Sequence, residues 1–151
     1  KETFRDERDE ASPLLYAHEA KNLSLGRGSL NESERKEIES HVVHTYNFLS
    51  AIPWTSALRR VPEFARGHHE KLDGSGYPRH VGAVELPLQT RMMTIADIYD
   101  ALTAADRPYK KAVPHERAID ILASDAREGR LDAELLGIFV EAKVYERVLT
   151  G

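Results

Sequence analysis

The sequence of 151 residues contains no cysteine, which excludes disulfide bonds and thiolate metal sites. It also lacks a basic excess, since its formal net charge is −4, and this argues against a surface for nucleic-acid polymers. No apolar run is long enough for a membrane span, and no signal-peptide pattern is present. We therefore expect a cytoplasmic protein without membrane insertion, in which His, Asp and Glu would hold any metal.

Alternating β-branched residues, which would predict strands, are nearly absent. Apolar residues instead recur at helical spacings of three and four, as in the stripe Ile38, Val42, Tyr46, Leu49 and Ile52. Asn31 and Glu34 form a capping-box pattern before that stripe. The charged residues 1–10 resemble a frayed helix start, and residues 14–25 a short amphipathic helix. These patterns predict an all-α domain of about five to seven helices.

Residues 68–78 are the most informative stretch of the chain, reading His-His-Glu-Lys-Leu-Asp-Gly-Ser-Gly-Tyr-Pro. Consecutive helical residues diverge by about 100°, so His68 and His69 would rarely bind one ion together. They can serve two neighbouring ions, or one can bind while the other packs, or both can lie on the surface. Gly76 permits close backbone approach to a ligand. Tyr77 offers a ring that could stack on a base or pack inward in a structural turn.

Four further positions could complete a site for a phosphorylated ligand. Asp97 lies among apolar neighbours, where a carboxylate is costly unless it binds a metal or pairs with a cation such as Arg91. His41 lies beside the apolar stripe, where a lone histidine more often packs in the core. Because the chain holds other histidines, a role of His41 as a metal ligand is a competing interpretation. Arg107 and Lys110 offer phosphate contacts, or else form a solvated basic turn.

Together these pieces resemble the HD-GYP family, bacterial metal-dependent phosphodiesterases whose usual substrate is cyclic di-GMP. The resemblance runs from about Leu30 to Leu136 and is highly specific, because all the pieces occur in the family's order. The matching pieces are His68-His69-Glu70, Asp73-Gly74-Ser75-Gly76-Tyr77-Pro78, Leu86-Pro87, Arg91, Ala96-Asp97, Asp100-Ala101-Leu102-Thr103 and Arg107-Pro108-Tyr109.

The resemblance implies a role for each of these positions. In the family, the positions of His41, His68, His69 and Asp97 are ligands of a centre with two or three divalent metal ions, for which Fe or Mn is expected here. The positions of Arg107 and Lys110 contact substrate phosphate, and the Gly76, Tyr77 and Pro78 loop borders the substrate groove. The implied reaction is metal-assisted hydrolysis of cyclic di-GMP to pGpG and then GMP.

The chain departs from the family pattern in several respects. It contains no His-Asp dipeptide, which in the family supplies central ligands, and His80 stands where the family often has glycine. We therefore expect an HD-domain-like helical bundle that is incomplete at its N-terminus, with residues 30–151 as the C-terminal part of an HD-GYP domain. Residues 1–29 form an N-terminal helical segment of unclear role, and we expect the chain alone to be inactive.

Two alternatives remain open from the sequence. One is a degenerate, non-catalytic module that binds a cyclic dinucleotide or a diguanylate cyclase domain as partner. The other is an HD-type hydrolase that acts on different phosphoesters. The family often dimerises, so a homodimer is a further option for the state of this chain.

Overall fold

The computed structural model describes residues 3–5, 11–13, 31–104 and 111–146. The chain divides into two compact units, Lys1–Ile38 and Glu39–Gly151, and each is described by itself. The proposed boundary between residues 29 and 30 stays a prediction. Among the described residues, no helix combines the length and apolar character needed to cross a bilayer.

The first unit contains a short hairpin that the sequence did not predict. Strands β1 (Thr3–Arg5) and β2 (Ala11–Pro13) pair antiparallel, with Phe4 opposite Ser12. The expectation of a helix start within residues 1–10 is therefore wrong at the β1 positions, where Thr3 and Phe4 have side chains that favour strands. The amphipathic helix expected over residues 14–25 lies outside the described residues.

The capping box at the start of the first described helix is confirmed. The backbone N–H of Glu34 donates to Asn31 Oδ1, and the backbone N–H of Asn31 donates to Glu34 Oε2, both at 2.8 Å. Each side chain therefore satisfies a backbone donor that the first helical turn leaves unpaired. This exchange explains why α2 begins at Glu32 and runs to Ser50.

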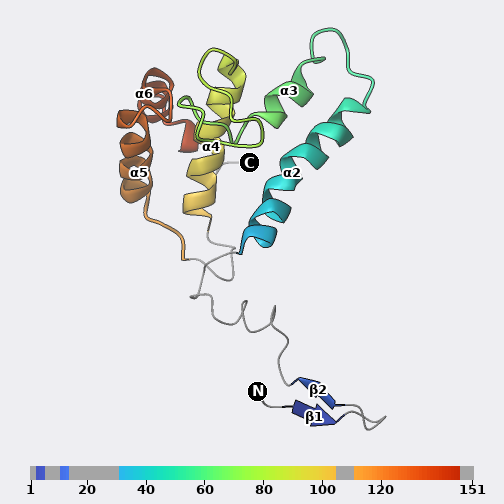
Figure 1. The fold of residues 1–151 in the computed structure, drawn as a ribbon. Helices are drawn as coiled ribbons and strands as arrows, with labels where there is room; N and C mark the ends of the chain where they lie inside the picture. Colours follow the sequence, from blue (N-terminus) through green and yellow to red (C-terminus); the bar gives the residue numbers. More distant parts are fainter. Residues whose placement is uncertain (1–2, 6–10, 14–30, 105–110, 147–151) are drawn as a thin grey trace. The chain divides into compact units, whose positions relative to one another are not determined.

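Five helices are present in the described residues, which confirms the all-α prediction apart from the short hairpin (Figure 1). They are α2 (Glu32–Ser50), α3 (Val61–Arg66), α4 (Leu88–Thr103), α5 (His115–Arg127) and α6 (Ala133–Glu141). In the second unit, α4 packs against α3, α5 and α6. It therefore forms the centre of the helical part of this unit.

The hydrophobic core lies where α4, α5 and α6 meet. Its buried members are Ile95, Leu122, Leu131, Leu136 and Phe139. Burying one such side chain stabilises a fold by about 1.5–3 kcal/mol, so this cluster holds the three helices together. Met92, on the same helix as the buried Ile95, is 53% exposed.

The loop between α3 and α4 folds back onto the chain segment that joins α5 to α6. The backbone N–H of Leu72 donates to the carbonyl of Arg130 at 3.0 Å, and the N–H of Ala83 donates to the carbonyl of Leu72 at 2.9 Å. Arg91 of α4 secures the end of the same loop, because its guanidinium donates to the carbonyls of Ala83 and Leu86 at 2.6 and 3.0 Å. The loop is thus held at both its beginning and its end.

Candidate metal centre

Three histidines from two elements come together in the second unit. His41 lies on α2, and His68 and His69 follow directly after α3; one ring nitrogen from each lies within 4.8 Å of the others. The Nε2 atoms of His41 and His69 are 3.2 Å apart. Two nitrogen ligands bound at about 2.1 Å to one ion lie about 3.0–3.4 Å apart. His41 and His69 therefore have the spacing of two ligands of the same metal ion.

A short hydrogen bond fixes the orientation of His68. Its Nδ1 lies 2.5 Å from the carbonyl oxygen of Ala65, the residue one turn earlier in α3. A carbonyl only accepts, so Nδ1 carries the proton and Nε2 of the neutral ring keeps its lone pair. Metal-binding histidines usually show this arrangement, in which an acceptor at the other ring nitrogen sets the tautomer. His68 is therefore prepared to bind through Nε2.

His69 is held in its neutral form by its surroundings. Burial lowers its pKa most, and charge repulsion from His68 lowers it further, while Asp97 opposes the shift. The result is a pKa of about 4 in place of the ordinary 6.5. Because a metal ion competes with a proton for the same lone pair, a neutral imidazole at pH 7 is ready to bind without releasing one.

Asp97 of α4 joins the histidines from the other side of His69. Its Oδ2 lies 3.6 Å from His69 Nδ1, whereas His41 approaches the Nε2 atom of the same ring. The sequence left open a pairing of Asp97 with Arg91, but Arg91 pairs with Asp132 at 3.0 Å. Asp97 can therefore act as a fourth metal ligand or as the carboxylate that orients His69.

The donor set fits a divalent transition metal. Neutral imidazoles and a carboxylate suit Fe, Mn, Zn and Ni, and the three imidazoles already converge on one volume. Two features support this fit without reference to any relative: the 3.2 Å spacing of His41 and His69, and the anchored tautomer of His68. Which of these metals binds is not decided by the donor set, so iron or manganese remains a proposal.

The Gly76, Tyr77 and Pro78 loop lies beside the histidines. The Tyr77 ring stacks on the His69 ring, with centroids 4.8 Å apart and planes inclined by 27°. Burial raises the pKa of the Tyr77 hydroxyl above its ordinary value, so that it stays protonated at neutral pH. The ring thus packs against a neighbouring side chain, and its stacking on a base stays a prediction. The other predicted substrate contacts, Arg107 and Lys110, lie outside the described residues.

One residue of this region was missed by the sequence reasoning. Glu70 is 1% exposed, and its carboxylate accepts hydrogen bonds from the backbone N–H groups of Arg79 and Val81. The signal was present in the sequence, because an acidic residue stands directly between the histidine pair and the glycine-rich loop. Its burial could not be predicted, since surface carboxylates are far more common.

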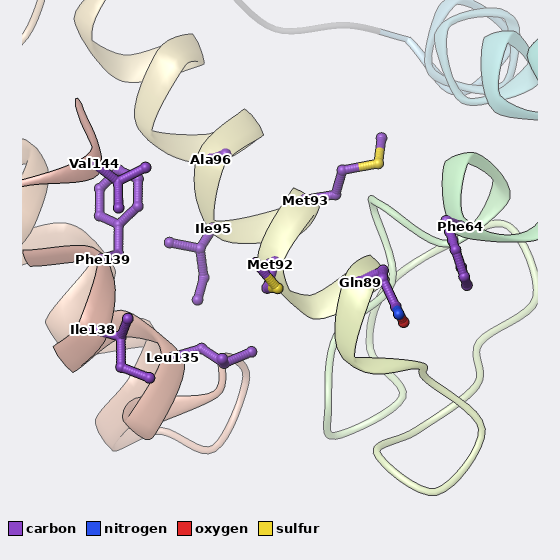
Figure 2. A pocket seen from close by; sticks show the side chains of 10 residues that line it. All are labelled: Phe64, Gln89, Met92, Met93, Ile95, Ala96, Leu135, Ile138, Phe139 and Val144. Carbon is purple, nitrogen blue, oxygen red and sulfur yellow. The ribbon is translucent and has the colours of Figure 1, made fainter. Parts of the chain in front are cut away.

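A cavity of about 440 Å³ lies elsewhere, between α4 and α6 (Figure 2). Figure 2 shows Leu135, Ile138 and Phe139 of α6 facing Met92 and Ile95 of α4. The full lining is Phe64, Gln89, Met92, Met93, Ile95, Ala96, Leu135, Ile138, Phe139 and Val144. None of these ten side chains can titrate, and Gln89 is the one polar member of the lining. None of the predicted site residues lines this cavity, so the cavity does not coincide with the predicted metal and substrate site.

Comparison with known proteins shows the family. A family model described as HD domain matches residues 17–135, beginning upstream of Leu30. The chain belongs to the HD-domain family. Within that family, the predicted HD-GYP assignment is confirmed by relatives that are named cyclic-dinucleotide phosphodiesterases.

Three of these relatives come from two bacteria. The 3′3′-cGAMP-specific phosphodiesterase 3 of Vibrio cholerae is 42% identical over 95 residues, which cover 63% of this chain and 20% of the relative. The 3′3′-cGAMP-specific phosphodiesterase 1 of the same organism is 37% identical over 113 residues, or 75% of this chain and 25% of the relative. A cyclic di-GMP phosphodiesterase of Pseudomonas aeruginosa is 34% identical over 115 residues, or 76% and 27%. The chain thus spans about a fifth to a quarter of their lengths.

Proposed function

We propose that this chain carries part of the metal centre of a phosphodiesterase that hydrolyses a cyclic dinucleotide. The observation that carries the proposal is the convergence of His41, His68 and His69, with Asp97 at the far side of His69. The substrate we favour is cyclic di-GMP, with pGpG and then GMP as products. The names of the relatives support a cyclic dinucleotide as substrate, and some of them name 3′3′-cGAMP instead.

The residues of the chain would contribute to the reaction mainly by binding and orientation. His41, His68 and His69 would hold a divalent ion, with Asp97 as fourth ligand or as orienting carboxylate. When bound, such an ion supplies Lewis-acid stabilisation of the charge that develops on phosphate oxygens. The neutral state of His69 keeps its lone pair available at pH 7. Arg107 and Lys110 are proposed as phosphate contacts, the guanidinium in a bidentate manner and the ammonium as a point charge.

A second candidate function is a non-catalytic module that binds a cyclic dinucleotide or a diguanylate cyclase domain. The observation that favours it is the absence of a His-Asp dipeptide from the sequence. Three imidazoles and one carboxylate would then form a metal or ligand site without turnover. The two candidates differ in a measurable way, because only the first produces linear dinucleotide.

The experiment uses the natural protein and both cyclic dinucleotides, cyclic di-GMP and 3′3′-cGAMP. Metal content and hydrolysis are compared among the wild type, His69→Ala, Asp97→Ala and Met92→Gln, the last a matched control from the apolar cavity. We expect His69→Ala to lower hydrolysis by at least about a hundredfold, since losing a ligand costs more than losing a group that only orients a ligand. Asp97→Ala should also lower hydrolysis, and Met92→Gln should retain the hydrolytic activity of the wild type.

Two outcomes would contradict the proposed hydrolysis. Substantial activity in both His69→Ala and Asp97→Ala would remove these residues from the site. Tight binding of a cyclic dinucleotide by a metal-loaded wild type, without any linear product, would support the non-catalytic module.

A further inference from the structure

Tyr77 touches His69 in two ways. Its ring lies on the imidazole at a centroid distance of 4.8 Å, and its backbone N–H donates to the carbonyl oxygen of His69 at 3.2 Å. The ring contact covers one face of the imidazole, and the backbone bond fixes the distance between the two chain segments. The orientation of His69 is therefore coupled to the position of the loop that carries Tyr77.

Glu70 holds that loop from inside. Its carboxylate is almost completely buried and accepts hydrogen bonds from the N–H groups of Arg79 at 2.7 Å and Val81 at 3.2 Å. A buried carboxylate is costly unless such donors satisfy it, so the loop and the carboxylate stabilise each other. Glu70 directly follows His69 in the sequence. Its two hydrogen bonds therefore tie the chain just after Pro78 to the histidine pair.

Gly76 makes the close approach possible. A Cβ atom at this position would lie 2.5 Å from the carbonyl oxygen of His69 and 2.5 Å from the backbone nitrogen of Lys71. Such overlap with backbone atoms cannot be relieved by a side-chain movement. Only glycine therefore lets the loop lie against residues 69–71, which brings the ring of the next residue, Tyr77, onto His69.

We infer that Tyr77 is a positioning residue for His69, and that Glu70 holds the loop in the conformation that presents its ring. The inference rests on the proposed metal centre, and it assigns the Gly-Tyr part of the loop a task within that centre. The second torsion of histidine is broad, so a free ring samples many orientations. Stacking on Tyr77 restrains the plane of the ring, and in that plane Nε2 faces His41 and Nδ1 faces Asp97. Metal sites gain affinity from such outer-shell restraint.

The test compares Tyr77→Leu, which removes the ring, with Tyr77→Phe, which keeps the ring and removes only the hydroxyl. Affinity for Mn²⁺ is measured by titration calorimetry on the full chain, and the His69 imidazole signals are measured by NMR without metal. We expect Tyr77→Leu to weaken Mn²⁺ binding about ten- to a hundredfold and to shift the His69 signals. Tyr77→Phe should stay within about twofold of the wild type and leave the His69 signals near their wild-type positions.

Glu70→Gln is the second variant, and it leaves the Tyr77 ring in the chain. A glutamine side chain keeps one oxygen but places an NH₂ group against a backbone donor, so one of the two bonds to Arg79 and Val81 is lost. We expect weaker Mn²⁺ binding, a shift of the His69 signals in the direction seen with Tyr77→Leu, and faster hydrogen exchange at the Val81 amide. If Tyr77→Leu does not fold, this variant decides the question.

The inference is overturned if Tyr77→Leu folds and matches the wild type in both Mn²⁺ affinity and His69 signals. It is also overturned if Tyr77→Phe loses as much affinity as Tyr77→Leu, because the hydroxyl would then be responsible. A Glu70→Gln variant identical to the wild type in both measurements removes the role of Glu70. If the wild type itself binds no Mn²⁺, the proposed function fails, and the His69 signals of the metal-free variants alone decide whether Tyr77 positions the ring.

Discussion

Two opposite faces of α4 have different surroundings in this protein. One, here called the polar face, carries Arg91, Thr94 and Asp97: Arg91 pairs with Asp132, Thr94 donates to the Thr90 carbonyl, and Asp97 lies 3.6 Å from His69. The other, the groove face, carries Gln89, Met92, Met93 and Ala96 and lines the apolar cavity shown in Figure 2.

The difference shows that cavity volume and chemical capacity are separate properties of this fold. Met92 and Met93 of the groove face are 53% and 40% exposed, whereas Thr94 of the polar face is 4% exposed. The polar face has residues able to orient a metal ligand, and its side chains are held by specific partners. The following changes test whether stability and metal binding depend on the polar face and not on the groove face.

The largest expected effect is that of Arg91→Met on the polar face. The change leaves the Ala83 and Leu86 carbonyls without their donor and removes the partner of Asp132. We expect the free energy of unfolding to fall by about 3 kcal/mol, measured by urea denaturation, because a partly buried carboxylate and two carbonyls lose their donor. A loss no larger than that of a surface substitution would show that the guanidinium does not hold the loop.

The next effect is an acid-induced loss of stability through His69. Its pKa is about 4 in the folded chain against an ordinary 6.5, so between these values the unfolded chain binds a proton that the folded chain does not. Stability must therefore rise with pH across this window and be lost as pH falls from 6.5 to 4. We expect a loss of roughly 1–2 kcal/mol in metal-free protein after solvent screening.

The measurement is the unfolding free energy of the chelator-treated chain at several pH values, for the wild type and for His69→Gln. Glutamine does not titrate in this range, so the unfolding free energy of His69→Gln should depend less on pH between 6.5 and 4 than that of the wild type. Parallel curves for the two proteins would show that His69 does not contribute this dependence.

A smaller effect, which stabilises the fold, is expected from a substitution at His80. This residue has a φ of +55°, in the left-handed region, where glycine is strained less than other residues. His80→Gly should raise the free energy of unfolding by about 0.5–1 kcal/mol, since relief of the backbone strain exceeds the entropy cost of glycine. Arg79→Gly is the matched control, because Arg79 does not share the positive φ. Equal effects at both positions would contradict this explanation.

The smallest effect is expected on the groove face itself. Met92→Gln replaces a half-exposed side chain by one of similar length, so the unfolding free energy should change by less than about 0.5 kcal/mol. The Mn²⁺ affinity should remain that of the wild type, because Met92 lines the apolar cavity, which none of the three histidines lines. A marked loss of metal affinity in this variant would break the proposed separation of the two faces.

The sequence predicted much of the site but little of its internal geometry. The order of the motif pieces indicated the family, and the residue types identified His41, His68, His69 and Asp97 as candidate ligands. The capping box at Asn31 was predictable because it involves only contacts three residues apart. The exposure of Met92 was not predictable, since helical spacing shows that a residue lies on an apolar stripe but not what covers that stripe.

The sequence alone determined the helical class, the family and the donor atoms available for a metal, because these follow from local periodicity, ordered motifs and residue chemistry. Only the tertiary structure decided that His41 lies 3.2 Å from His69, that Asp97 approaches the opposite nitrogen, and that Tyr77 stacks on the ring between them. These relations join residues from separate elements. They depend on how the helices pack and on the buried Glu70 that holds the loop, and no local pattern in the sequence specifies such contacts.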